Sequence, residues 1–302
     1  MKYVAPSAPL TVGGVLDNWL RLFRGSFAAC WAIALIAAIA GALVQLSLTP
    51  QLPTRGVPAA QYYLQYFSSL STPRVFLTDI ALWLITMTVY GALLSQQAAL
   101  VRGEDTYSFA DALGKGLRRL PQMVLGVVLI ALIIAAVCIP AGIAGIVMFA
   151  LHRSPLGGLL LAVGITITVV LAIYVSLRLN LWMAVMFSEN RDGAAALKRS
   201  WQLVENHWWR VTGIVFVSGI VIWILSVAVG AIAGVIVGFM SVRGTTPELL
   251  LHRIQLIGAV GAVVRLLSMP LLTAVWLAIY YDLKLRREGA DLAERTEALS
   301  GN

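Results

Sequence analysis

Six long apolar stretches, separated by shorter polar segments, dominate the pattern of this 302-residue chain. A helix rises about 1.5 Å per residue, so about 20 apolar residues cross the roughly 30 Å of hydrocarbon in a bilayer. The stretches lie at about residues 27–48, 76–101, 121–151, 156–187, 211–240 and 254–283. The pattern predicts an all-α integral membrane protein with six transmembrane helices, in which Pro140 and Pro270 are candidate kink positions.

Basic residues are distributed unequally between the segments that join these spans. Fifteen of the 22 lysines and arginines fall on the side that holds both termini, five fall on the other side, and Arg178 and Arg265 fall within spans. The fifteen are Lys2, Arg21, Arg24, Arg102, Lys115, Arg118, Arg119, Arg191, Lys198, Arg199, Arg210, Lys284, Arg286, Arg287 and Arg295. Cytoplasmic loops carry an excess of Lys and Arg, so we expect both termini to be cytoplasmic.

The stretch "ALKRSWQLVENHWWRV", residues 196–211, is far more polar than its surroundings. Projected at about 100° per residue, it gives an amphipathic helix. Leu197, Trp201 and Trp208 lie on the apolar face as expected interfacial anchors, and Lys198 and Arg199 lie on the polar face. This pattern is typical of a helix in the membrane interface that contacts anionic headgroups. Ser200 falls at the edge of the apolar face, which favours helix packing over a nucleophilic role.

The apolar spacing of this helix occurs twice more. Leu16, Leu113 and Leu197 each begin the same spacing, 97 and then 84 residues apart, and each segment precedes two spans. Within one membrane domain, 1–302, we therefore predict a threefold repeat of surface helix plus two spans. Its units cover about 10–105, 106–190 and 191–292, and 293–302 form a polar tail. Unrelated cytoplasmic amphipathic linkers are the alternative.

Composition and motifs limit the classes of function. The chain is 60% hydrophobic and 12% charged, unlike a soluble globular protein. Its net charge of +8 suits the anionic face of a membrane, so no nucleic-acid partner is expected. Two cysteines form no disulfide framework. The three histidines have no metal-site spacing, and there is no phosphate-binding loop. We expect no metal, no cofactor and no catalytic residues.

Three polar residues lie within predicted spans: Arg178 and Asn180 in "SLRLNLW", and Arg265 in "VVRLLSMP". Such residues are costly in lipid and usually face a bundle interior or an aqueous cavity. Arg178 either reaches the cytoplasmic headgroups or binds a lipid phosphate or another anion in a cavity. For Arg265 the alternatives are the same anion site or a structural pairing with a carbonyl or Asp79.

Small residues follow one stripe of the fifth span, at Ser226, Gly230, Gly234 and Gly238. Such stripes let helix backbones approach closely in lipid. The stripe predicts helix packing, against another span of this chain or against a second subunit in a homo-oligomer.

Three motifs resemble one family. "AALKRSWQLVENHWWRV" at 195–211, "YYDLKLRREGADL" at 280–292 and "LTVGGVLDNWLRLFRGSF" at 10–27 are similar to the membrane domain of glycerophosphoryl diester phosphodiesterase. The resemblance implies a six-helix bundle in the bacterial inner membrane. It does not imply catalysis, because the phosphodiesterase chemistry of fused members belongs to a separate soluble barrel.

Two classes of function remain from the sequence. The first is a non-enzymatic polytopic protein that contacts lipids or envelope partner proteins. The second is a transporter or lipid-translocating protein with an anion or headgroup site near Arg178 and Arg265.

Overall fold

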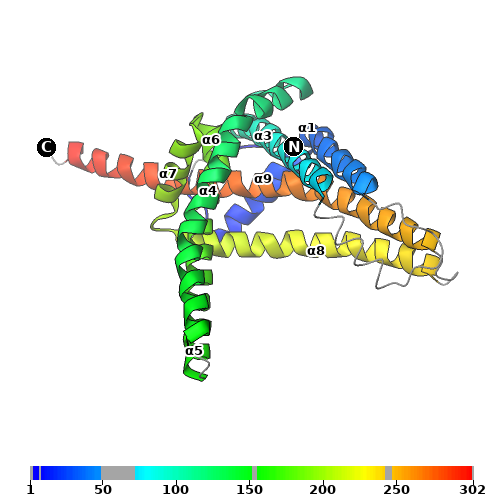
Figure 1. Ribbon diagram of the computed structural model, residues 1–302. Coiled ribbons are helices and arrows are strands. Elements are labelled where there is room, and N and C mark those ends of the chain that lie inside the picture. The colour runs from blue at the N-terminus through cyan, green and yellow to red at the C-terminus, as the bar shows by residue number, and fades with distance from the viewer. Residues whose placement is uncertain (1–2, 7, 49–71, 152–154, 242–246, 301–302) are drawn as a thin grey trace. The chain divides into compact units, whose positions relative to one another are not determined.

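The computed structural model describes residues 3–6, 8–48, 72–151, 155–241 and 247–300, and all regular structure in these ranges is helical (Figure 1). The helices are α1 (Val12–Leu48), α3 (Pro73–Val101), α4 (Phe109–Leu151), α5 (Pro155–Leu179), α6 (Trp182–Glu189), α7 (Gly193–Val204), α8 (Trp208–Ser241) and α9 (Pro247–Ser300). Six segments of the described chain are long and apolar enough to cross a membrane, which confirms the six predicted spans.

Local sequence explains where several helices begin and end. Pro73 follows Thr72, which has the extended backbone of an N-cap residue, so the proline stands where a missing N–H costs nothing. Helix α6 ends at Asn190, whose φ of 56° is left-handed. Asparagine tolerates that conformation better than most residues, so it suits this helix end.

The fourth span differs from the uninterrupted helix predicted at 156–187. Helix α5 stops at Leu179, residues 180–181 form a turn, and α6 begins at Trp182. The Asn180 N–H donates to the Leu177 carbonyl at 3.3 Å, a tighter turn than that of an α-helix. No proline or glycine lies at the interruption, and the helix end that it leaves is stabilised by a contact of Ser200 described below.

The stretch 196–211 is also not one helix. Helix α7 ends at Val204, and a turn at 205–207 leads into α8 at Trp208. The His207 N–H donates to the Val204 carbonyl at 3.0 Å. The projection that placed Trp201 and Trp208 on one continuous helix face therefore fails beyond Val204.

The other two predicted surface segments are parts of longer helices. Residues 16–27 belong to α1 and residues 113–124 belong to α4, each without interruption. Separate surface helices are thus not present there, and the threefold repeat stays a prediction.

The chain divides into two compact units. Unit 1 comprises residues 1–5, 16–120 and 216–275, and unit 2 comprises residues 6–15, 121–215 and 276–302. The apolar core of unit 1 joins α1, α3, α4 and α9 through Cys30, Ile33, Leu93, Ala112 and Met269.

Neutral polar groups link the helices of unit 1. Trp19 of α1 donates from Nε1 to the Leu271 carbonyl of α9 at 2.9 Å. Gln97 of α3, fully buried, donates from Nε2 to the Pro270 carbonyl at 2.9 Å and to Ser26 Oγ at 3.3 Å. Hydrogen bonds between helices are a main source of specific association in lipid, so these side chains fix how α1, α3 and α9 pack.

Unit 2 packs α7 against α5 and α6. Two glycines of this unit lie at close approaches. A Cβ atom on Gly193, the first residue of α7, would lie 2.5 Å from the Gln122 carbonyl oxygen of α4. A Cβ on Gly126 of α4 would lie 2.4 Å from the Trp182 ring of α6. Glycine is needed at both positions because any larger residue would push the helices apart.

Large apolar side chains on α5 and α8 are exposed, among them Leu159, Val163, Ile167, Phe216 and Trp223. In water this surface would be unfavourable, whereas in a bilayer it meets hydrocarbon. Exposure of this kind along helices of spanning length is what a lipid-facing surface requires.

Candidate functional site in unit 2

Asp282 of α9 is a buried carboxylate with several partners from distant parts of the sequence. It is 2% exposed, and its Oδ1 accepts a hydrogen bond from the Leu10 N–H at 2.9 Å. Its Oδ2 lies 3.0 Å from Arg210 Nε and 3.2 Å from Arg286 Nε. Two guanidinium groups and an amide therefore compensate one buried negative charge, as a low-dielectric site requires.

The same two arginines also hold the N-terminal segment. Arg210 donates from Nη2 to the Leu10 carbonyl at 2.6 Å, and Arg286 donates to the same oxygen. Both backbone groups of Leu10 are thus bonded to side chains of α8 and α9. This clamp fastens the segment before the first span to the beginning of the fifth and the end of the sixth.

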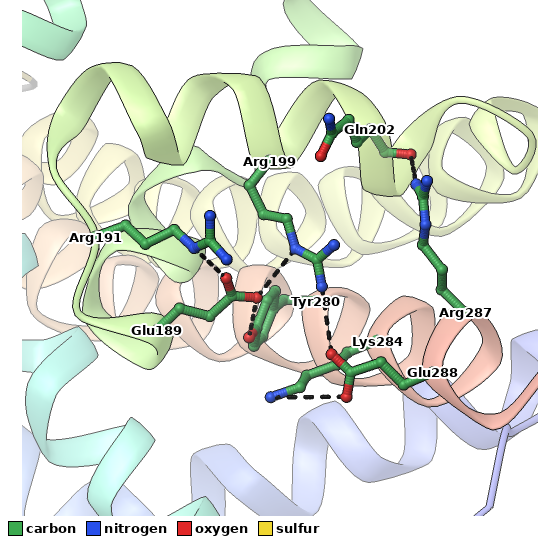
Figure 2. Close-up of polar contacts among 8 residues, drawn as sticks. All are labelled: Glu189, Arg191, Arg199, Gln202, Tyr280, Lys284, Arg287 and Glu288. Atoms are coloured by element: carbon green, nitrogen blue, oxygen red, sulfur yellow. Dashed lines mark hydrogen bonds and ion pairs between the residues drawn. The ribbon is translucent and has the colours of Figure 1, made fainter. Parts of the chain in front are cut away.

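Glu189, the last residue of α6, is the centre of a second cluster (Figure 2). Its carboxylate lies 2.6 Å from Arg191 Nε and 3.3 Å from Arg199 Nε, and it accepts a hydrogen bond from the Tyr280 hydroxyl at 3.0 Å. Arg199 also reaches Glu288 of α9 at 3.3 Å. The side chain of Glu189 is only 11% exposed, so this network joins α6, α7 and α9 from the inside.

A further link extends this arrangement to α4. Gln122 Nε2 donates to Asp192 Oδ1 at 3.0 Å. Asp192 precedes α7 and makes no capping bond to that helix with its side chain. Unit 2 thus joins five parts of the chain: the segment before the first span, the start of the third span, the end of the fourth, the start of the fifth and the end of the sixth.

The two central carboxylates of these clusters are less exposed than several of the surrounding basic residues. Asp282 and Glu189 have side chains 2% and 11% exposed, whereas the Arg191 side chain is 47% exposed, and Lys198 and Arg287 are exposed as well. We call the following residues the basic cap: Arg191, Lys198, Arg199, Arg210, Lys284, Arg286 and Arg287. These seven basic residues outnumber the four acidic residues of the clusters, Glu189, Asp192, Asp282 and Glu288.

His207 lies in the turn beside this cap. Burial lowers the pKa of its imidazole, and the nearby cations Arg286, Arg210 and Arg287 lower it further, while Asp282 opposes them. The environment therefore favours the neutral imidazole.

Arg178, at the end of α5, has a different environment. It is 7% exposed, and its guanidinium carbon lies 4.4 Å from the ring centre of Trp201 and 5.0 Å from that of Tyr174. Its Nη2 donates to the Glu205 carbonyl at 3.2 Å. Its Nε is buried without a hydrogen-bond partner.

Ser200 bonds to the helix end at the interruption next to Arg178. This serine of α7 is fully buried and donates from Oγ to the Arg178 carbonyl at 2.8 Å. The carbonyl belongs to the last turn of α5, where helical partners are missing. The hydroxyl stabilises the open end of α5.

The other predicted residues of this region are placed as follows. Asn180 lies half-buried in the interruption, Lys198 is exposed, and Arg199 joins the Glu189 cluster. Leu197 is buried within the protein at 6% exposure. Trp201 and Trp208 both contact the Tyr174 ring, and their ring centroids lie 6.3 and 5.6 Å from its centroid. The neighbouring Trp209 stacks on Trp208 and is 72% exposed.

Arg265 and the small-residue stripe lie in unit 1. Arg265 is exposed and its guanidinium lies against Gly41 of α1, and among the described residues it makes no ion pair with Asp79. Arg265 belongs to unit 1 and Arg178 belongs to unit 2. Ser226 donates to the Ile222 carbonyl of its own helix, and a Cβ at Gly230, Gly234 or Gly238 would meet open space in the described chain.

Sequence reasoning missed four residues that organise the site: Leu10, Glu189, Tyr280 and Asp282. A signal existed for Asp282, because it is a carboxylate within the last predicted span, where an ionisable residue requires a partner. For Glu189 the signal was its place between an apolar run and Arg191. Nothing in the sequence marks Leu10, because its role rests on its backbone.

Comparison with known families supports the predicted resemblance. Residues 156–289 match the family model described as the membrane domain of glycerophosphoryl diester phosphodiesterase. Together with the six apolar helices, this match identifies the class of protein. The protein is a multi-pass membrane protein. No curated protein and no solved structure matches the chain.

The match covers less than half of the chain but most of the candidate site. It begins at α5 and ends at Gly289 of α9, so it includes Arg178, Glu189, Arg199, Asp282 and the interruption of the fourth span. The N-terminal motif at 10–27 lies outside it. The matched family is that of a membrane domain, and the match includes no catalytic domain.

Proposed function

We propose that this protein is a non-enzymatic polytopic protein of the bacterial inner membrane that binds anionic lipid headgroups through the basic cap and contributes in this way to envelope organisation. One observation carries the proposal: in unit 2 the side chains of Asp282 and Glu189 are only 2% and 11% exposed, whereas those of Arg191, Lys198 and Arg287 are exposed. Anionic lipids attract clustered basic residues by about 1 kcal/mol for each Lys or Arg near the surface. The match to a membrane domain without a catalytic domain supports a role that needs no chemistry.

The proposed orientation places the basic cap and both termini in the cytoplasm. The excess of basic residues on that side supports it. The contacts of Leu10, Arg210 and Asp282 support the same-side placement of these segments, because they require the segment before the first span to meet the end of the sixth. In this orientation α7 lies at the interface as the clearest of the three proposed surface segments, and Trp209 reaches the headgroup region, where indole rings are favoured.

Lipid selectivity tests the proposal. The protein is reconstituted in vesicles with spin-labelled phosphatidylglycerol or phosphatidylcholine, and the immobilised fraction of each is measured at low and high salt. We expect a preference for phosphatidylglycerol that weakens with salt, because exposed charges are screened. Arg191→Gln, Lys198→Gln and Arg287→Gln combined should reduce that preference.

The matched control exchanges the same three residues for the other basic residue, as Arg191→Lys, Lys198→Arg and Arg287→Lys. It keeps the charge and should keep the preference. Equal immobilisation of both lipids by the wild-type protein at low salt would contradict the proposal.

A lipid-translocating or transport protein is the second candidate, and one observation favours it. The fourth span is interrupted beside a buried arginine, and discontinuous helices form binding sites in many transporters. Proteoliposomes that move a fluorescent phospholipid between leaflets faster than protein-free vesicles would favour this candidate over the first.

A further inference from the structure

Arg178 is a deeply buried cation whose charge is not balanced by a carboxylate among the described residues. It is 7% exposed, and its contacts are two aromatic rings and one backbone carbonyl. The two buried carboxylates of the same unit, Asp282 and Glu189, each have two arginines within 3.3 Å. Unit 2 therefore balances its buried negative charges and leaves its most buried positive charge open.

The guanidinium also has unused hydrogen-bonding capacity. An arginine carries five N–H donors, and a buried donor without an acceptor is costly. Within the described ranges, the acceptor bonded to Arg178 is the Glu205 carbonyl, and Nε is buried with no partner there. Stacking on Trp201 and Tyr174 orients the guanidinium plane but supplies no acceptor. The missing group is an anion with oxygen atoms.

The position of the guanidinium indicates which anions can reach it. The Glu205 carbonyl belongs to the turn between α7 and α8, and Glu205 and Asn206 are exposed in that turn. Trp208 begins the next span directly after it. Arg178 is rooted within a span, yet its head group lies beside a boundary turn, where phospholipid phosphates are found.

We propose that Arg178 binds a phosphate group, with Trp201 and Tyr174 holding its planar fork in position. A guanidinium fork matches two phosphate oxygens, which an ammonium group does not. The ligand is a phosphodiester of an anionic phospholipid or free inorganic phosphate, since both present the same oxygens. For the phospholipid this deepens the proposed function and rests on it, but Arg178 is not part of the basic cap.

The test uses the full chain purified in mild detergent and native mass spectrometry. Phosphatidylglycerol is added in one arm and inorganic phosphate in the other, and bound adducts are counted. We expect one tightly held adduct on the wild-type protein, and about a tenfold or greater loss of its affinity in Arg178→Gln, because a hydrogen bond between charged groups is removed. Arg178→Lys keeps the charge without the fork and should fall between the two.

Two controls separate the site from a folding defect. Arg21→Gln removes an exposed cation that pairs with Asp17 and lies outside the basic cap, and should retain the adduct. Arg178→Lys is compared with the wild type by near-ultraviolet circular dichroism, so a weaker adduct on a folded protein supports the site. An adduct equally strong in all variants, or no adduct of either ligand on the wild-type protein, overturns the proposal.

Failure here is distinguishable from failure of the proposed function. Loss of salt-sensitive lipid selectivity in the basic-cap variant concerns exposed residues and leaves Arg178 unchanged. An Arg178-dependent adduct of inorganic phosphate without one of phosphatidylglycerol supports the site and assigns it to free phosphate. Selectivity for phosphatidylglycerol that survives in Arg178→Gln, with the single adduct unchanged, overturns only the Arg178 site.

Discussion

Asp282 and Arg178 are both buried ionisable residues near the ends of spans, but the groups around their charges in unit 2 are different. Asp282 has two guanidinium groups and the Leu10 amide around one carboxylate. Arg178 has two aromatic rings and one carbonyl around a full positive charge. The first arrangement is complete within the chain and holds the structure together. The second leaves an N–H without a partner, which is the property of a binding group rather than of a structural one.

The largest effect expected from this comparison is on Asp282. Asp282→Asn removes the buried negative charge and leaves Arg210 and Arg286 side by side without it. Breaking a buried pair in this way costs about 3–5 kcal/mol. Thermal unfolding in detergent should show a large decrease in the midpoint, and limited proteolysis should release the N-terminal segment that Leu10 anchors.

Glu288→Gln is the matched control for that variant. Glu288 is also on α9 and also pairs with basic residues, but its side chain is 50% exposed. An exposed ion pair contributes about 0–1 kcal/mol, so the midpoint should change little. Equal effects of the two variants would show that burial is not what distinguishes Asp282.

A smaller effect is expected at Ser200, which supports the end of α5 beside Arg178. Ser200→Ala leaves the buried Arg178 carbonyl without its donor, at a cost of about 1–3 kcal/mol. Ser176→Ala is the control, because the Ser176 hydroxyl bonds only within α5, to the Ala172 carbonyl, and the residue is exposed. Unfolding midpoints of the two variants should differ clearly. If they are the same, the hydroxyl of Ser200 does not stabilise the interruption.

Ser200 also shows which part of the fold was readable from the sequence. Apolar runs longer than a bilayer is thick predict six spans, because lipid allows few alternatives for a backbone of that length. The interruption at 180–181 was not predictable, because "LRLNLW" contains neither proline nor glycine. The carbonyl of Arg178 accepts a hydrogen bond from a hydroxyl 22 residues away, and a one-dimensional pattern contains no such contact.

The candidate site was predictable only in part, for the same reason. Arg178 was identified because an ionisable residue inside an apolar run is rare and costly. Asp282 meets the same criterion, but the basic run directly after it indicates the cytoplasmic end of the span and so obscures the signal. The break between α7 and α8 was missed because residues 205–207 continue the helical spacing of their neighbours.

Replacement of Arg178 by an apolar residue of similar length sharpens the comparison, since it should cost far less than Asp282→Asn. In zwitterionic detergent without phosphate, Arg178→Met loses about 0.5–2 kcal/mol of cation–π attraction and about 1 kcal/mol of hydrogen bonding. Removal of an unbalanced buried charge offsets this loss, so stability should stay within about 1 kcal/mol of the wild type.

Added phosphatidylglycerol should then separate the two proteins. A ligand that binds only the folded state stabilises it, so the wild-type midpoint should rise with lipid concentration while that of Arg178→Met stays constant. A large loss of stability in Arg178→Met without lipid would instead make Arg178 a structural residue like Asp282.

The smallest effect concerns pH and comes from His207. Burial and the cations Arg286 and Arg210 hold the pKa of this imidazole below its usual value of 6.5. Between that lowered pKa and pH 6.5 the unfolded chain binds more protons than the folded protein, so stability rises with pH in this window. The contribution is complete above about pH 6.5 and is lost as the pH falls through the lowered pKa. The unfolding midpoint of the wild type should be lower at pH 5.5 than at pH 7.5, and His207→Gln should flatten this change.

The same titration distinguishes the two buried groups. Asp282 raises the pKa of His207 against the effect of the arginines, so Asp282→Asn should lower that pKa further and extend the window to lower pH. Arg178 is not among the largest contributors to the shift, so Arg178→Met should change the pH dependence little. Chemical shifts of the His207 ring in labelled protein report this directly. A shift of its titration in Arg178→Met would show that the two environments are coupled, and the contrast between a closed clamp and an open site would then no longer hold.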